Sequence, residues 1–205
     1  MYLSRIKLNL NKRETIIALA NPQKIHGAVA HAYTNYKEAR PLWRIDTLNN
    51  ERYLLLLGKE PPNLHQIANQ FSWQSEPNTV ITKDYNAFLQ NIENGSTWNF
   101  RLTANPVVCI NGHRVPHVTP ASQLRWLSDR AEKNGFVINF AEIIGTNTYN
   151  LQRGGGSKTK SNLNSVTFAG QLTVLDKTKF SEALKNGIGH SKAYGMGLLT
   201  IVKPV

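Results

Sequence analysis

The sequence is poor in cysteine and in long apolar runs, and each shortage excludes a class of protein. Its one cysteine, Cys109, cannot form an internal disulfide. The apolar runs are short, as at residues 54–57, and none has the length of a membrane-spanning helix. Residues 2–10 alternate like a strand and show no signal-peptide pattern. We therefore expect a cytoplasmic protein that does not bind membranes.

Acidic residues are also scarce, with 13 Asp and Glu against 24 Lys and Arg, which gives a net charge of +11. An excess of this size attracts polyanions and speeds association with them. Nucleic acid is the leading partner class, and an anionic membrane surface is disfavoured because no basic amphipathic helix is visible. The 205 residues are enough for one large domain or two domains of about 100 residues each.

The first half of the chain has the element order βαββαβ. Asn21 and Pro22 are favoured at a helix start, and the paired asparagines within residues 47–51 suit a tight hairpin. The expected elements are a strand at 2–10, a helix from 21 to about 34–37, strands at 42–46 and 52–58, a helix within 61–71 and a strand at 78–85.

The second half repeats this order. The expected elements are a strand at 97–110, a helix at 120–135, strands at 136–145 and 165–176, a helix at 177–189 and a strand at 195–205. Two βαββαβ units in tandem predict an α+β fold of two ferredoxin-like, RRM-like domains. We place them at residues 1–94 and 95–205.

Two of the six histidines lie on the first predicted helix. The apolar stripe that should face the core consists of Ile25, Val29, Ala32 and Tyr36. His26 falls at one margin of this stripe, with Tyr33 and, less closely, Gln23 beside it. His31 lies about 140° further round the helix, so the two histidines cannot share a metal ion. Lys24 is also on the side opposite His26. A half-buried structural role for His26 remains open at this point.

Two glycine-rich stretches could approach phosphates. The loop at 152–165 combines three glycines with Arg153, Lys158 and Lys160 and has no acidic residue. A solvated, idle hairpin would have the same composition. The second stretch, "GIGHSKAYGMGLL", fits neither a Rossmann nor a Walker motif, and by its pattern alone it is a structural turn.

Five stretches in the same order resemble one known family. They are "NPQKIH", "RLTANPVV", "VPHVTPASQLRWLSDRAEKNGF", "VTFAGQLTVLD" and "GIGHSKAYGMGLL". They closely resemble the CasE-type CRISPR RNA-processing endoribonucleases of the Cascade complex. The resemblance implies tandem ferredoxin-like domains and metal-independent cleavage of CRISPR repeat RNA at the base of its hairpin, with no cofactor. It also implies retention of the product beside other Cascade subunits, and we expect a monomer in isolation.

The resemblance also implies roles for individual residues. His26 takes the catalytic position of the family, and Gln23 stands where close relatives have a tyrosine. Glutamine cannot release a proton, so an acid role at that position is excluded. We expect slow chemistry, in which Tyr33 or His31 compensates or His26 acts largely alone.

RNA contacts are expected from three places in the chain. Arg153, Lys158 and Lys160 would hold the hairpin stem, Lys192 and Tyr194 would lie near the bound strand, and Lys24 is a further candidate. One alternative is a non-catalytic pair of RRM-like domains, although no run of aromatic and basic residues typical of such RNA binders is visible. The other is a ribonucleoprotein subunit that has lost its cleavage activity, for which Gln23 is the reason.

Overall fold

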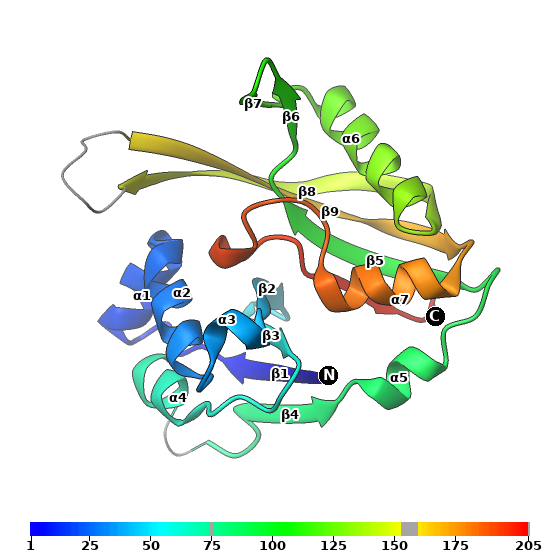
Figure 1. Ribbon diagram of the computed structural model, residues 1–205. Coiled ribbons are helices and arrows are strands. Elements are labelled where there is room, and N and C mark those ends of the chain that lie inside the picture. Colours follow the sequence, from blue (N-terminus) through cyan, green and yellow to red (C-terminus); the bar gives the residue numbers. More distant parts are fainter. Residues whose placement is uncertain (74–75, 153–159, 205) are drawn as a thin grey trace. The chain divides into compact units, whose positions relative to one another are not determined.

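A computed structural model describes residues 1–73, 76–152 and 160–204 (Figure 1). The chain forms two compact units. Met1–Asn91 and Lys192–Gly195 make up the N-terminal unit, and Ile92–Ser191 with the residues from 196 onward make up the C-terminal unit. The predicted division at residues 94 and 95 lies close to this one, but it misses the short return of residues 192–195 to the N-terminal unit.

The N-terminal unit contains a four-stranded antiparallel sheet in the order β2-β3-β1-β4. Its strands are β1 (Tyr2–Lys7), β2 (Leu42–Leu48), β3 (Glu51–Gly58) and β4 (Val80–Asp84). Asn49 and Asn50 both have positive φ, at 49° and 63°, as the hairpin between β2 and β3 requires. This is the ferredoxin-like strand order, so the predicted fold class is confirmed for this unit.

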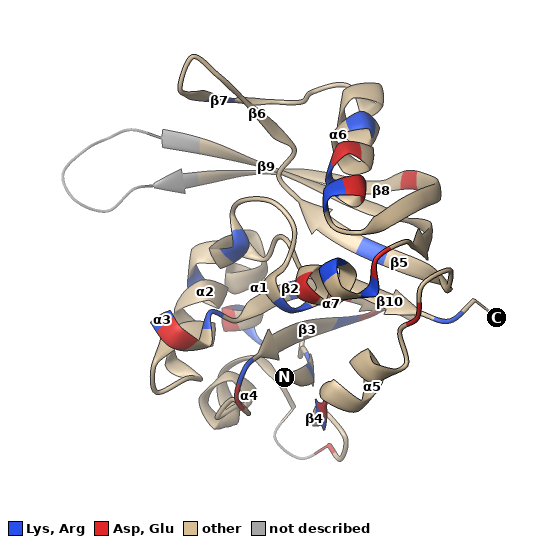
Figure 2. Cartoon of the chain, turned by 45° about the vertical axis from the view of Figure 1, so that its right-hand side comes forward, with Lys and Arg blue, Asp and Glu red and all other residues tan. Residues whose placement is uncertain are grey.

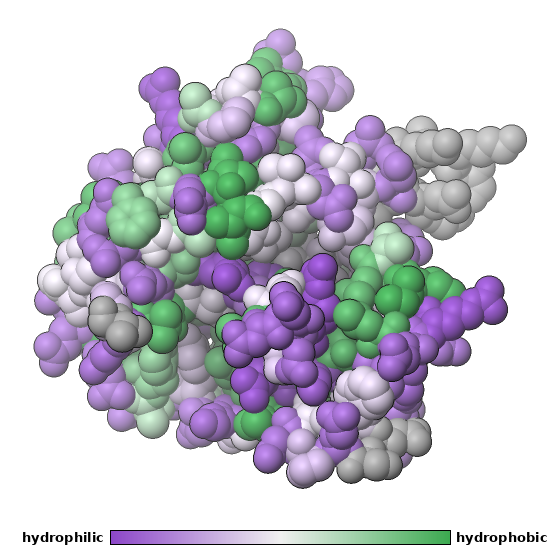
Figure 3. Space-filling view, turned by 180° about the vertical axis from the view of Figure 1, so that it is seen from behind, coloured by the Kyte–Doolittle hydropathy of each residue, from purple (hydrophilic) through white to green (hydrophobic). Residues whose placement is uncertain are grey.

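Helices α1 (Arg13–Ala20), α2 (Pro22–His31), α3 (Tyr36–Ala39), α4 (His65–Phe71) and α5 (Asn86–Gln90) complete the N-terminal unit. The sequence did not predict α1, because its apolar residues do not follow one helical face: Ile16 and Ile17 are exposed while Thr15 is buried. In the view from behind, a hydrophobic patch is visible in the region of α1 (Figure 3).

The helix predicted to run to residues 34–37 ends earlier, at His31. The carbonyl oxygen of Ala32 accepts a hydrogen bond of 2.8 Å from the backbone N–H of Asn63. This long-range bond ties down the chain just where the helix ends, and α3 then begins separately at Tyr36.

The C-terminal unit has the corresponding sheet, in the order β10-β5-β9-β8. Its strands are β5 (Thr97–Ala104), β8 (Phe136–Gln152), β9 (Lys160–Val174) and β10 (Leu199–Val202). The predicted helices are present as α6 (Pro120–Lys133), capped by Thr119, and α7 (Lys177–Asn186), capped by Asp176. In the loop predicted over 152–165, the described residues, 152 and 160–165, are strand, because β8 and β9 pair as far as Gln152 and Lys160.

The single strand predicted at 97–110 is wrong in its second half. The chain leaves β5 at Asn105 and Pro106, and β6 (Val107–Ile110) pairs instead with β7 (His113–Pro116) in a separate hairpin. Proline cannot donate a ladder hydrogen bond, which favours a break there. Cys109 on β6 is therefore exposed.

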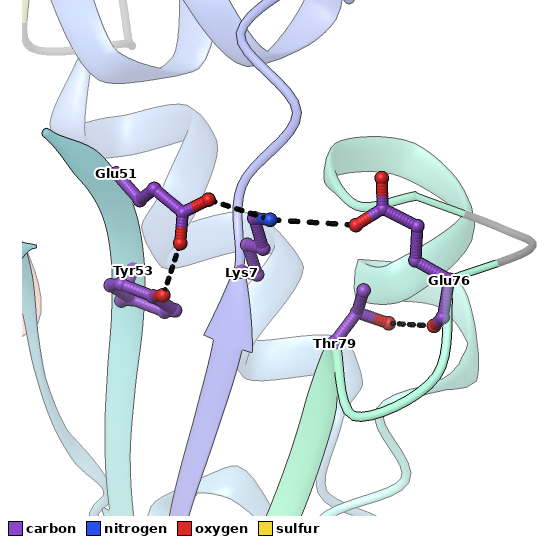
Figure 4. Close-up of polar contacts among 5 residues, drawn as sticks. All are labelled: Lys7, Glu51, Tyr53, Glu76 and Thr79. Atoms are coloured by element: carbon purple, nitrogen blue, oxygen red, sulfur yellow. Dashed lines mark hydrogen bonds and ion pairs between the residues drawn. The ribbon is translucent and has the colours of Figure 1, made fainter. Parts of the chain in front are cut away.

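A polar cluster at the end of β1 links three segments of the N-terminal unit (Figure 4). The Lys7 ammonium lies 2.7 Å from Glu51 and 3.4 Å from Glu76, and the Tyr53 hydroxyl donates to Glu51 at 2.6 Å. The hydrogen bond from Lys7 is the main cause that lowers the pKa of Glu51. These contacts tie β1 to β3 and to the segment before β4.

In the part of the chain described, no helix combines the length and the apolar character needed to cross a bilayer.

Candidate functional site around His26

The start of α2 fixes the position of His26. The side chain of Asn21 accepts the backbone N–H of Gln23 at 3.0 Å, and Pro22 occupies the first turn. Both features stabilise the beginning of a helix. Ile25 and Val29 anchor α2 in the core, and they leave His26 half-buried at the edge of the apolar face.

Tyr36 of α3 lies against the imidazole. Its hydroxyl is 3.2 Å from Nδ1 of His26, and the two rings meet edge to face with centroids 5.3 Å apart and an interplanar angle of 76°. A hydrogen bond to one ring nitrogen orients the imidazole and leaves Nε2 available for another partner.

Tyr194 covers a second side of His26. It belongs to η1 (Lys192–Tyr194), the short 3-10 helix that packs with α2 and β2 in the N-terminal unit. The rings of His26 and Tyr194 are 6.1 Å apart at their centroids. Gly195 follows with φ +80°, and a Cβ there would lie 2.6 Å from the Trp43 ring. Glycine at 195 therefore lets η1 sit close to Trp43 and brings Tyr194 to α2.

Burial sets the protonation states at this site. It lowers the pKa of His26 and raises the pKa of Tyr36. Near neutral pH the imidazole is therefore mostly uncharged and can accept a proton, while the phenol keeps its proton. Burial also lowers the pKa of Lys192, with the positive charge of Arg40 as the second cause.

The structure brings together only some of the residues that the sequence suggested. Gln23 is half-buried one turn before His26 on the same side of α2. His31 is exposed, and its Nδ1 lies 2.7 Å from the Gly27 carbonyl of its own helix. Tyr33 is in the core with its hydroxyl against Gly58, and burial raises the pKa of its phenol. Neither Tyr33 nor His31 is placed as a partner of His26.

From the sequence, Tyr36 was assigned to the apolar stripe that faces the core, and its contact with His26 was not predicted. The prediction assumed one helix through residue 36, in which positions ten residues apart cannot meet. The break after His31 turns Tyr36 back toward α2. No local signal in the sequence marks that turn, and the Ala32–Asn63 hydrogen bond at the end of α2 joins distant segments.

The structure places some of the predicted RNA-binding residues, and others lie outside the described ranges. Lys24 is exposed on α2, and Lys192 and Tyr194 lie in η1 at the His26 site. Arg153 and Lys158 lie outside the described residues, and Lys160 begins β9 without a described side chain. Within residues 1–73, 76–152 and 160–204, no cluster of three His, Cys, Asp or Glu side chains could hold a metal ion.

Replacing Tyr36 with phenylalanine tests the hydrogen bond to His26. Losing it should slow any reaction that uses this imidazole by about 3- to 10-fold, since such a bond contributes about 0.5–1.5 kcal/mol. The hydroxyl also stabilises the imidazolium, so the pKa of His26 should fall and the midpoint of the rate–pH profile should move to lower pH. Tyr53→Phe, on β3, should change neither quantity. An unmoved midpoint in Tyr36→Phe would contradict the positioning role.

Comparison with known proteins decides the family. The model of a family described as "CRISPR associated protein" matches residues 1–203. The chain belongs to this family. It is 28% identical to the CRISPR-associated endoribonuclease Cse3 of Thermus thermophilus, over 98% of this chain and 99% of that protein. The predicted resemblance is confirmed.

Solved structures of relatives agree with this assignment. Thermus thermophilus Cse3, bound to an RNA that represents a pre-cleavage complex, superposes with a TM-score of 0.82 at 25% identity, covering 98% of both chains. A chain of a CRISPR RNA-guided surveillance complex in a pre-nicking state superposes with a TM-score of 0.73 at 22% identity, covering all of both chains. The first of these structures is of a CRISPR-associated endoribonuclease bound to RNA, and the second shows the shared fold.

Proposed function

We propose that this member of the CRISPR-associated family is a metal-independent endoribonuclease that cuts precursor CRISPR RNA at the base of the repeat hairpin. One observation carries the proposal: a half-buried His26, whose pKa burial lowers, is held by Tyr36 beside Tyr194 of the glycine-rich segment. The similarity to an RNA-bound endoribonuclease supports it.

His26 acts first as a general base in this proposal. With Nδ1–H donating to Tyr36, Nε2 accepts the proton of the 2′-hydroxyl next to the cut. The 2′-oxygen forms a bond to the adjacent phosphorus, and the bond from phosphorus to the 5′-oxygen breaks. The imidazolium returns the proton to the departing oxygen. The products are a 2′,3′-cyclic phosphate and a 5′-hydroxyl, and no water or redox partner is consumed.

The basic and aromatic groups around His26 hold the substrate. The ammonium group of Lys192 offsets charge on the phosphate, and Tyr194 packs against the bound strand. Lys24 and the stretch with Arg153, Lys158 and Lys160 contact the hairpin. The protein keeps its product, joins other subunits of a Cascade complex and works in the cytoplasm.

A cleavage assay in EDTA tests this function. The purified protein, in excess over a labelled hairpin repeat RNA, should give one cut whose 5′ product carries a cyclic phosphate and whose 3′ product carries a 5′-hydroxyl. A substrate with 2′-deoxyribose at the cut should bind and stay intact, because the nucleophile is missing. Cleavage only after a divalent metal is added would overturn metal independence.

A non-catalytic RNA-binding subunit is the second candidate, favoured by Gln23 in place of the tyrosine of close relatives. This candidate predicts full binding and no cut by wild-type protein in the same assay.

A further inference from the structure

The C-terminal unit has a cleft of about 500 Å³. It lies among the β6–β7 hairpin, α6 and the start of the glycine-rich segment at His190, all within one unit. The sites proposed above use none of its residues.

Basic side chains dominate the cleft. Arg114 comes from β7, Arg125, Arg130 and Lys133 come from α6, and Asp129 is the one acidic residue in the lining. None of these five groups forms an ion pair with another residue of the described ranges. Basic and acidic segments are both visible along α6 (Figure 2). The uncompensated excess of positive charge favours an anionic ligand.

The cleft also has an apolar and aromatic part. Val107 and Val108 of β6 and the indole of Trp126 line it. Trp126 is 5% exposed, and its Nε1–H has no acceptor among the described residues. Arg130 lies over the indole ring, 5.7 Å from its centroid. Because the Nε1 atom is itself buried, the indole offers a ligand in the cleft no hydrogen bond, and its part is to support the Arg130 guanidinium.

We propose that this cleft binds a single-stranded RNA segment that flanks the repeat hairpin. The arginines match phosphate oxygens, which guanidinium groups bind through two parallel hydrogen bonds. The valines provide an apolar surface, and Arg130 over the Trp126 ring provides a flat guanidinium against which a base can stack. An acidic protein segment would use the positive charge but would leave the apolar wall without a purpose. The proposal rests on the proposed function, because that function brings a flanked hairpin to the chain.

The test compares two RNAs, the hairpin alone and the hairpin with single-stranded extensions on both sides. Binding is measured by fluorescence anisotropy at several salt concentrations, with 2′-deoxyribose at the cut so that no cleavage occurs. The variant is Arg125→Gln with Lys133→Gln, both exposed on α6. The control, Lys177→Gln with Lys203→Gln, removes the same charge from exposed positions outside the cleft.

The cleft variant should bind the extended RNA about 10- to 100-fold more weakly than wild type. Its slope of log K against log salt should flatten by about 1.4 units, at about 0.7 for each single-strand phosphate that the protein no longer neutralises. Affinity for the hairpin alone should stay unchanged, as should both affinities of the control. Arg114→Gln, from the other wall of the cleft, should show the same selective loss.

Equal affinities of the cleft variant and the control for the extended RNA would overturn the cleft as an RNA site and leave an acidic protein segment as the alternative ligand. A loss of the same size for the hairpin alone and for the extended RNA would overturn the single-stranded flank as the occupant, because the contact would then be to the hairpin. Failure of the proposed function is distinguishable, because it would abolish cutting of a ribose-containing hairpin and leave the binding difference in place. Thermal unfolding of each variant confirms that the fold is kept.

Discussion

Replacing His26 with alanine is expected to slow single-turnover cleavage of the hairpin by about 10² to 10⁴-fold, the usual contribution of positioned acid–base catalysis. Affinity for the RNA should change little, since the uncharged imidazole contributes no charge to phosphate binding. The wild-type rate should rise with pH and level off above the pKa of His26, which burial lowers. The rate of the alanine variant should lack this step.

The matched control is His65→Ala, which removes an exposed histidine of the same unit that contacts Asn69. Its rate should equal the wild-type rate. His31→Ala tests the alternative raised by the sequence, and the exposed position of His31 predicts no large effect. A His26→Ala protein that cleaves at the wild-type rate would contradict the catalytic assignment.

Replacing Asp46 with alanine should lower the free energy of unfolding by about 3–5 kcal/mol, the typical cost of removing one partner from a buried ion pair. Arg44 on β2 is 1% exposed. Its Nε and Nη2 donate to the two carboxylate oxygens of Asp46 at 2.6 and 2.7 Å. Without that carboxylate, a buried guanidinium loses its anionic partner inside the sheet.

Urea unfolding at neutral pH measures this loss. Glu51→Ala is the control, because it removes a carboxylate of the same sheet whose ion pair with Lys7 is at the surface. Exposed pairs are screened by water and salt, so its unfolding midpoint should move little. Equal shifts in the two variants would show that burial of Arg44 gives its ion pair no special importance.

Much of the fold follows from local signals in the sequence. Asn49 and Asn50 mark the β2–β3 hairpin, Thr119 with Pro120 marks the start of α6, and Asp176 marks the start of α7. These signals act within a few residues, so they can be read without knowledge of the tertiary structure. By contrast, α1 was not predicted because it exposes two isoleucines. The β6–β7 hairpin was not predicted because β6 follows β5 closely, so that the sequence pattern predicts one strand over both.

The site was less predictable than the fold. His26 was identified through the resemblance of "NPQKIH" to a catalytic helix, and its position at the edge of the apolar stripe followed from helical periodicity. The contacts with Tyr36 and Tyr194 depend on where α2 stops and on how closely Gly195 approaches Trp43. Both are properties of the folded core, which no pattern of neighbouring residues encodes.

The return of residues 192–195 to the N-terminal unit has a consequence for biosynthesis. His26 and Tyr36 are translated early, but Tyr194 is translated much later, after the main part of the C-terminal unit. A nascent or prematurely terminated polypeptide would therefore carry the imidazole and its first tyrosine with one side uncovered. The complete arrangement around His26 therefore cannot form before residues 192–195 have been translated.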